Sequence, residues 1–310
     1  MNFDLAVWGE RDPWRIINAA QKIEGKVDRL WLPETIDLDS VSILGAIAAR
    51  TNTLKLGAGI LNIYTRTLPL IAMTAVTLQL ISKKRFSLGI GVSTDNILEK
   101  HDVQMHQPLA QLRSAIQALR LAQTIDNKTT YKLPLQVSFP IYVGTIGEKM
   151  SSLAGELADG LILNCATPEY AKKLMEMAFR GANEANRGHQ EIEIEAALIF
   201  SLDLQRDRQS IVRRLAYYGA AASYNHMFNR SGFVTESEQL SKAWMRKDSQ
   251  EAQRAISNEM IETLTATPEN LSKISQRYAS IGLTRMILVP VNFTGVANFL
   301  EKSTLPTFRD

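Results

Sequence analysis

The sequence predicts an α/β protein: one (β/α)8 barrel domain that spans residues 1–310. Eight short β-rich runs alternate with longer amphipathic stretches along the chain. Several of these runs, such as FSLGIG and RMILVPV, are apolar at consecutive positions, which is typical of strands covered on both faces. A doubly wound open sheet is the weaker alternative, because WGERDPW after the first run is not a GxGxxG fingerprint.

Taken in order, the elements follow from periodicity and from the positions of proline and glycine. Pro13 suits the first turn of a helix, and apolar residues recur at helical spacing after it. Further helices are expected over Ser40–Arg50 and Pro69–Ile81, around Leu112 and from about Glu148. The eight predicted strands are Phe3–Trp8, Arg29–Leu32, Lys55–Leu61, Phe86–Gly91, Ile141–Gly144, Gly160–Leu163, Ile192–Leu204 and Thr284–Val289. Between Ser210 and Tyr278 no convincing strand appears, which predicts a helical insertion around residues 206–280.

Composition excludes several classes of function. The 35 basic and 32 acidic residues leave a net charge of 35 − 32 = +3, too small a surplus to indicate nucleic-acid binding. One cysteine, Cys165, rules out a disulfide framework, and four scattered histidines form no metal pattern, so no metal is expected. The opening MNFDLAVWGERD is unlike a signal peptide, and the longest apolar run, Leu68–Ile81, is shorter than a membrane span. These features predict a soluble, cytoplasmic protein.

Candidate site residues lie at the ends of the predicted strands, because barrels bind ligands there. Glu34 follows the second strand, Thr94 and Asp95 follow the fourth, and Asn164 ends the sixth. An isolated glutamate is more often solvated or salt-bridged than catalytic, and a lone Cys165 is more often a small buried hydrophobe. Motifs such as GxSxG, HExxH and GxxxxGK[ST] are absent from the sequence, so hydrolase, zincin and P-loop functions have no support.

The segment Gly144-Thr145-Ile146-Gly147 is the best phosphate cradle in the sequence. Two glycines permit close backbone approach, and the helix that follows offers unpaired N–H groups. Judged by spacing alone, an ordinary βα turn is the more common explanation.

Five segments together carry a resemblance to a known family. They are RLWLPE (29–34), TNTLKLGAGILNIYTRT (51–67), AMTAVTLQLISKKRFSLGIG (72–91), PIYVGTIGEKMSSLAGELADGLILN (140–164) and ENLSKISQRYASIGLTRMILVPV (269–291). In this order the chain resembles the bacterial-luciferase-like flavin and deazaflavin oxidoreductases, most closely the coenzyme F420-dependent methylenetetrahydromethanopterin reductases.

The resemblance implies a cofactor site in the mouth of the barrel. A flavin or deazaflavin ring would lie over the end of the third strand, where a non-proline cis peptide, here Gly59–Ile60, forms a bulge. The cofactor phosphate would lie on Gly144–Gly147. Contacts to the cofactor are therefore expected from Glu34, Gly59, Ile60, Leu61, Gly91, Ser93, Gly144, Thr145, Ile146, Gly147 and Asn164.

Two departures and one near match leave the reaction open. Many F420-dependent relatives have Asp-His where this chain has Glu34-Thr35, and the reductase branch has an acid at the position of Ala6. The glucose-phosphate-oxidising branch has an acid near the position of Thr94-Asp95. The expected catalytic residues are accordingly Glu34, Thr94 and Asp95.

Three functions remain open on this basis. The first is F420-dependent hydride transfer to or from a small organic substrate, as in methylenetetrahydromethanopterin reductase. The alternatives are an FMN-dependent monooxygenase and a cofactor-poor, non-catalytic relative. The helices Ser40–Arg50 and Pro69–Ile81 are apolar around most of their circumference, which together with the resemblance predicts a two-fold homodimer through them.

Overall fold

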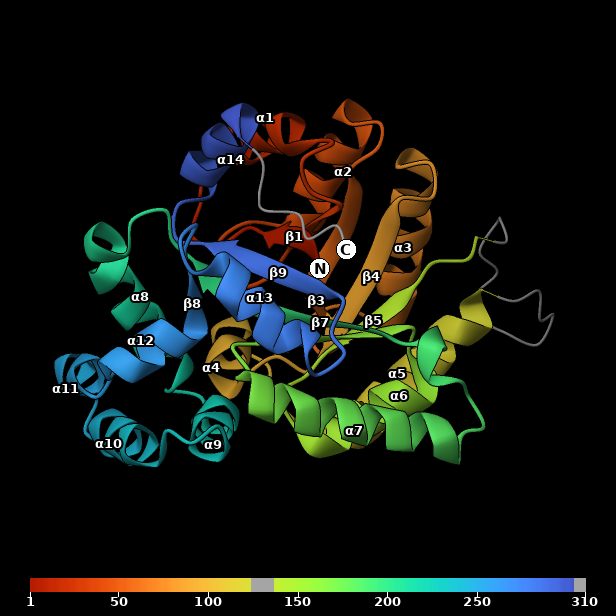
Figure 1. The fold of residues 1–310 in the computed structure, drawn as a ribbon. Helices are drawn as coiled ribbons and strands as arrows, with labels where there is room; N and C mark the ends of the chain where they lie inside the picture. Colours follow the sequence, from red (N-terminus) through yellow and green to blue (C-terminus); the bar gives the residue numbers. More distant parts are fainter. Residues whose placement is uncertain (124–136, 304–310) are drawn as a thin grey trace.

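Eight parallel strands close into the predicted barrel in the computed structural model, which describes residues 1–123 and 137–303 (Figure 1). Strands β1 to β7 pair with their neighbours in sequence order, and β9 closes the ring between β7 and β1. The strands are β1 (Asn2–Ala6), β2 (Arg29–Leu32), β3 (Lys55–Asn62), β4 (Phe86–Gly91), β5 (Ile141–Gly144), β6 (Gly160–Asn164), β7 (Glu193–Phe200), β8 (Thr265–Ala266) and β9 (Arg285–Pro290). Every residue of β2, β4 and β9 is buried, which explains their continuous apolar runs.

Three strand predictions need correction. The first strand ends at Ala6 rather than Trp8, and the seventh ends at Phe200 rather than Leu204. Asp203 stops β7, because its side chain accepts a hydrogen bond from the Arg206 amide and caps the next helix. The segment thought to lack strands contains the two-residue β8, which pairs with the end of β7.

Helices cover the outside of the barrel (Figure 1). They are α1 (Pro13–Ile23), α2 (Ser40–Arg50), α3 (Leu68–Ile81), α4 (Asp95–Leu98), α5 (Pro108–Ala122), α6 (Glu148–Leu157), α7 (Pro168–Glu184), α8 (Leu204–Tyr218), α9 (Ala222–Arg230), α10 (Val234–Met245), α11 (Ser249–Arg254), α12 (Asn258–Leu264), α13 (Leu271–Ala279) and α14 (Phe293–Lys302), with 3₁₀ turns at Glu99–His101 and His189–Glu191. Helices α9 to α12 form a group on one side of the barrel, away from α3. Among the described residues, no helix is long and apolar enough to cross a membrane.

The register between β3 and β4 shifts between Ala58 and Leu61. The Gly59–Ile60 peptide bond in this interval is cis, as the resemblance implies. The shift leaves Ile60 half-buried in the barrel mouth, where it packs against an interior cluster that includes Trp31, Tyr142 and Ile287.

Below that cluster, the amino-terminal half of the barrel interior is charged. Asp4 on β1, Arg29 on β2, Glu195 on β7 and Arg285 on β9 are all buried there. Arg29 lies 2.5 Å from Glu195, and Arg285 lies 2.7 Å from Asp4. Burying polar and charged groups is costly unless they are paired or hydrogen-bonded, so these contacts allow a polar layer to fill this part of the barrel.

Candidate functional site

A cavity of about 490 Å³ opens at the carboxyl ends of the strands. Most of the residues expected at the site line this cavity: Glu34, Gly59, Ile60, Gly91, Ser93, Thr94, Asp95, Gly144, Thr145, Ile146, Gly147 and Asn164. Leu61 does not line it, since its side chain is fully buried in the layer between strands and helices. The difference follows from the pleat, because adjacent residues of a strand point to opposite faces.

Trp31 forms part of the cavity floor and accounts for two glycines of β3. Trp31 is only 1% exposed, and its side chain packs against that strand. A Cβ atom at Gly57 would fall 2.1 Å from Trp31 Cε3, and one at Gly59 would fall 3.2 Å from Trp31 Cβ. The GAG sequence is therefore a packing requirement of the indole.

Ile60 makes the neighbouring glycines necessary in the same way. A Cβ at Gly144 would lie 2.8 Å from Ile60 Cγ2, and one at Gly91 would lie 3.1 Å from Ile60 Cδ1. The bulged residue thus occupies the space that side chains on β4 and β5 would otherwise fill. Three strands that are distant in sequence are shaped around one isoleucine in the mouth of the barrel.

The first backbone amides of α6, which begins beside the cavity, are free to donate hydrogen bonds. Gly147 is the N-cap of α6, and no side chain caps this helix. Among the described residues, the amides of Glu148, Lys149 and Met150 have no hydrogen-bond partner. An anion at this position would meet these donors and the positive end of the helix dipole.

The backbone conformation of Gly147 is one that any residue can adopt. Gly147 has φ −127°, an ordinary extended conformation, so no left-handed backbone requires glycine there. A Cβ at Gly147 would meet no atom within 4 Å. The glycine is therefore dispensable for the fold itself and keeps open the space beside the free amides.

Basic side chains surround the same helix end. Glu148, the first residue of α6, forms ion pairs with Lys173 at 2.9 Å and with Arg230. The Nε atom of Arg230 donates a hydrogen bond to His226 Nε2 at 2.9 Å, and His226 lines the cavity. Two cations, Lys173 and Arg230, against one carboxylate leave a positive charge near this end of the cavity, which favours an anion.

Glu34 lines the cavity, but its carboxylate is committed to an ion pair. Arg66 donates to both of its oxygens, each at 2.7 Å, and also contacts Asp39 at 2.5 Å. Such bidentate pairs are the strong, geometrically specific kind. The arrangement makes Glu34 an anchor for the loop after β3.

The residues after β4 form the opposite rim. Ser93 has φ +63°, in the left-handed region that non-glycine residues seldom adopt outside functional sites or turns. Thr94 and Asp95 follow it at the start of the short helix α4. Asp95 is exposed and has no ion-pair partner among the described residues, so it is the accessible carboxylate of the cavity.

An aromatic wall formed by Trp8, Tyr218 and Tyr224 completes the cavity, and the sequence did not reveal it. Tyr218 and Tyr224 are stacked with ring centroids 4.8 Å apart, and Trp8 meets Tyr218 edge-on at 5.5 Å. Arg214 lies 5.2 Å over the Trp8 ring. Tyr218 and Tyr224 belong to α8 and α9, whose periodicity is merely helical, so only the fold places them over the barrel.

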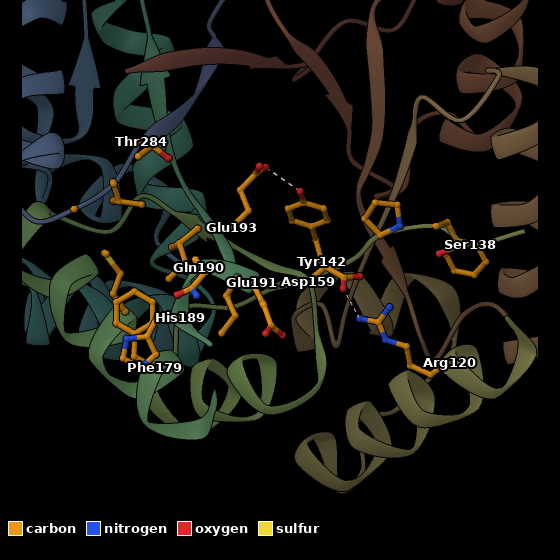
Figure 2. Close-up of a pocket in the computed structure, with 17 residues that line it drawn as sticks. Arg120, Ser138, Tyr142, Asp159, Phe179, His189, Gln190, Glu191, Glu193 and Thr284 are labelled. Carbon is orange, nitrogen blue, oxygen red and sulfur yellow. Dashed lines mark hydrogen bonds and ion pairs between the residues drawn. The ribbon is translucent and has the colours of Figure 1, made fainter. Parts of the chain in front are cut away.

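A second cavity, of about 760 Å³, lies at the other end of the barrel (Figure 2). It is lined by residues that precede β5, β6, β7 and β9, and Figure 2 shows the Tyr142–Glu193 hydrogen bond and the Arg120–Asp159 ion pair on its wall. Conserved chemistry in barrels of this type is built at the carboxyl ends, while the amino ends serve stability. We therefore assign the functional site to the smaller cavity.

The fold and the cavity together define a (β/α)8-barrel protein with a ligand-sized cavity at the carboxyl ends of its strands. Trp31 and Ile60 give the cavity an apolar floor, and free amides lie at the end of the cavity where α6 begins. Among the described residues, no cluster of His, Cys, Asp and Glu is suited to hold a metal ion.

The chain belongs to the luciferase-like monooxygenase family, whose model matches residues 10–285. The 5,10-methylenetetrahydromethanopterin reductase of Archaeoglobus fulgidus is 26% identical over 281 residues, which cover 84% of each chain. The coenzyme F420-dependent tetrahydromethanopterin reductase of Methanopyrus kandleri has a similar structure, with a TM-score of 0.80, 20% identity and coverage of 99% of both chains. The monooxygenase RslO1 of Streptomyces bottropensis matches with a TM-score of 0.65 and 17% identity, over 97% of this chain and 96% of that one. The protein is thus an oxidoreductase of the group that uses F420 or a flavin.

Proposed function

We propose that the protein is an F420-dependent oxidoreductase that transfers a hydride between the deazaflavin and a small organic substrate, as methylenetetrahydromethanopterin reductase does. The observation that carries the proposal is the combination of the Ile60 bulge with the uncapped end of α6 in one cavity. Similarity to reductases that use F420, over most of the chain, favours deazaflavin over FMN.

The chain's own residues would bind and orient the cofactor. Trp31 and Ile60 would support the ring from below, and the amides from Glu148 onward would hold the phosphate. Bound deazaflavin supplies two-electron hydride chemistry, which needs neither a metal nor a nucleophilic side chain. The aromatic wall over the ring would exclude water from the reacting face.

Cofactor titration tests the proposal. Purified protein is titrated separately with F420 and with FMN, and binding is followed by absorbance and fluorescence. We expect saturable binding of F420 at least tenfold tighter than that of FMN. Tighter binding of FMN would indicate a flavin monooxygenase, and binding of neither cofactor would indicate a non-catalytic relative; either result contradicts the proposal.

A further inference from the structure

The hydroxyl of Tyr224 has an unused proton in the cavity. Asn164 Nδ2 donates a hydrogen bond to this hydroxyl at 2.7 Å, so the phenol oxygen is already an acceptor. A phenol has one proton to donate, and among the described residues no acceptor is placed to receive it. Tyr224 lines the cavity, so a bound molecule can reach this donor.

The position of this hydroxyl is fixed by a chain of contacts. Arg214 donates to the carbonyl oxygens of Val289 and Pro290, at 3.1 and 3.2 Å, and so is fastened to the end of β9. It packs on Trp8, which abuts Tyr218, which in turn stacks on Tyr224. A donor held in this way need not reorganise when a ligand binds.

The surroundings favour a neutral interaction. Burial raises the pKa of both Tyr218 and Tyr224, so both phenols stay protonated throughout the physiological range. No lysine or arginine lines the cavity in the described part of the chain. A ligand group beside the aromatic wall therefore meets uncharged hydrogen-bond donors and aromatic surface, rather than a cation.

We propose that Tyr224 is a substrate-binding residue that donates a hydrogen bond to an uncharged acceptor, a carbonyl oxygen or imine nitrogen, at the reacting end of the substrate. The inference rests on the proposed function, since it assigns the substrate class of the same cavity. It predicts compounds that are neutral where they react, in contrast to substrates held there by a phosphate or carboxylate.

The proposal can be tested on cofactor-free protein with a chromophoric aldehyde, 4-(dimethylamino)cinnamaldehyde. A hydrogen bond to the carbonyl of this push–pull dye shifts its absorption to longer wavelength. We expect a red shift on binding to the wild type, and loss of most of that shift with at least threefold weaker binding in Tyr224→Phe. Tyr64→Phe is the matched control, because the Tyr64 hydroxyl donates to the His106 carbonyl outside the cavity.

A second variant keeps both rings in place. In Asn164→Asp the neighbour of Tyr224 changes from a hydrogen-bond donor to a carboxylate, which would accept the hydrogen bond of the phenol, occupy its only donor and abolish the red shift. An equal shift in wild type, Tyr224→Phe and Asn164→Asp, or no shift in the wild type, would overturn the proposal. Titration of F420 into the wild type separates the two hypotheses. A wild type that binds no F420 would refute only the proposed function, whereas a dye shift that persists in Tyr224→Phe would refute only the assignment of Tyr224.

Discussion

Glu195 is a fully buried carboxyl of the barrel interior, and its contacts link the charged layer to the cavity floor. One oxygen accepts from Arg29 at 2.5 Å and the other accepts from Trp31 Nε1 at 3.0 Å. Burial, reinforced by the charge of nearby Asp4, raises its pKa well above the ordinary value. The Trp31 indole on the cavity floor thus donates to a carboxyl group that stays protonated at pH values where an exposed glutamate is ionised.

We expect Glu195→Gln to change the pH dependence of stability in a defined direction. Above about pH 4.3 an unfolded glutamate loses its proton while native Glu195 keeps it, so this residue makes wild-type stability fall as pH rises. The variant lacks this proton linkage. Its free energy of unfolding relative to wild type should therefore increase from pH 4.5 towards pH 8, as measured by urea denaturation.

Glu193→Gln is a control, because its free energy of unfolding relative to wild type should change with pH in the opposite direction. Burial alone would raise the pKa of Glu193, but a hydrogen bond with Glu195 and the charges of Arg29 and Arg285 lower it to about 2. Its contribution to stability is present above about pH 4.3 and is lost as pH falls towards 2. The variant should therefore lose stability relative to wild type as pH rises from 2 to 4.5; parallel profiles for both variants would contradict these assignments.

Single residues show where sequence reasoning reached its limit. Gly91 and Gly144 stand out in the sequence because they end strands, but the sequence cannot show that Ile60 requires them. Nor can it show that Gly57 and Gly59, inside β3, are required by Trp31. Glu34 was identified as a site residue, yet its partner Arg66 lies 32 residues further on. Pairing over such distances depends on the closed barrel and has no local signal.

Among the elements, the β5–α6 turn makes the strongest case for a ligand. We expect Gly147→Val to lower F420 affinity at least tenfold, about 1.4 kcal/mol, because its side chain would occupy the open space beside the free amides. The fold should persist, since a Cβ there meets no atom within 4 Å and the backbone is extended. Isothermal titration measures the affinity, and circular dichroism checks the fold.

Two further variants should lower F420 affinity less than Gly147→Val does. Gly147→Ala should have a smaller effect in the same direction. Thr145→Ala removes a hydroxyl that accepts from the Gly147 amide at 3.2 Å, and should cost roughly 1 kcal/mol or less. An unchanged F420 affinity in a folded Gly147→Val protein would show that Gly144–Gly147 does not bind the cofactor phosphate.

Strand–helix alternation was readable in the sequence because buried parallel strands are continuously apolar and their ends are marked by glycine. Two elements were not readable in this way. The strand β8 is only two residues long and exists because β7 offers it a pairing edge. The aromatic wall comes from α8 and α9, and ordinary helical spacing gives no hint that Tyr218 and Tyr224 close the barrel mouth.

The whole molecule presents an apolar surface on α3, on the side of the barrel away from α9–α12 (Figure 1). This helix contains no charged residue from Leu68 to Ile81. Leu70, Met73, Leu80 and Ile81 are large exposed hydrophobic residues, with Met73 56% exposed. Apolar clusters of this kind on a globular protein commonly mark an interface, and a two-fold dimer buries one such patch against its copy.

We propose a homodimer through α2 and α3, and expect the variant Met73→Glu/Leu80→Glu to be monomeric. Four carboxylates would be introduced into one two-fold interface, since each change occurs in both copies, and burying unpaired charge is costly. Light scattering at micromolar concentration should give a mass near 69 kDa for wild type, twice the 34.6 kDa chain, and half that for the variant. Met245→Glu is the control, because Met245 is 75% exposed on α10 and lies outside the patch; it should leave the dimer intact. A wild-type mass of one chain, or dissociation by Met245→Glu alone, would place the interface elsewhere or exclude it.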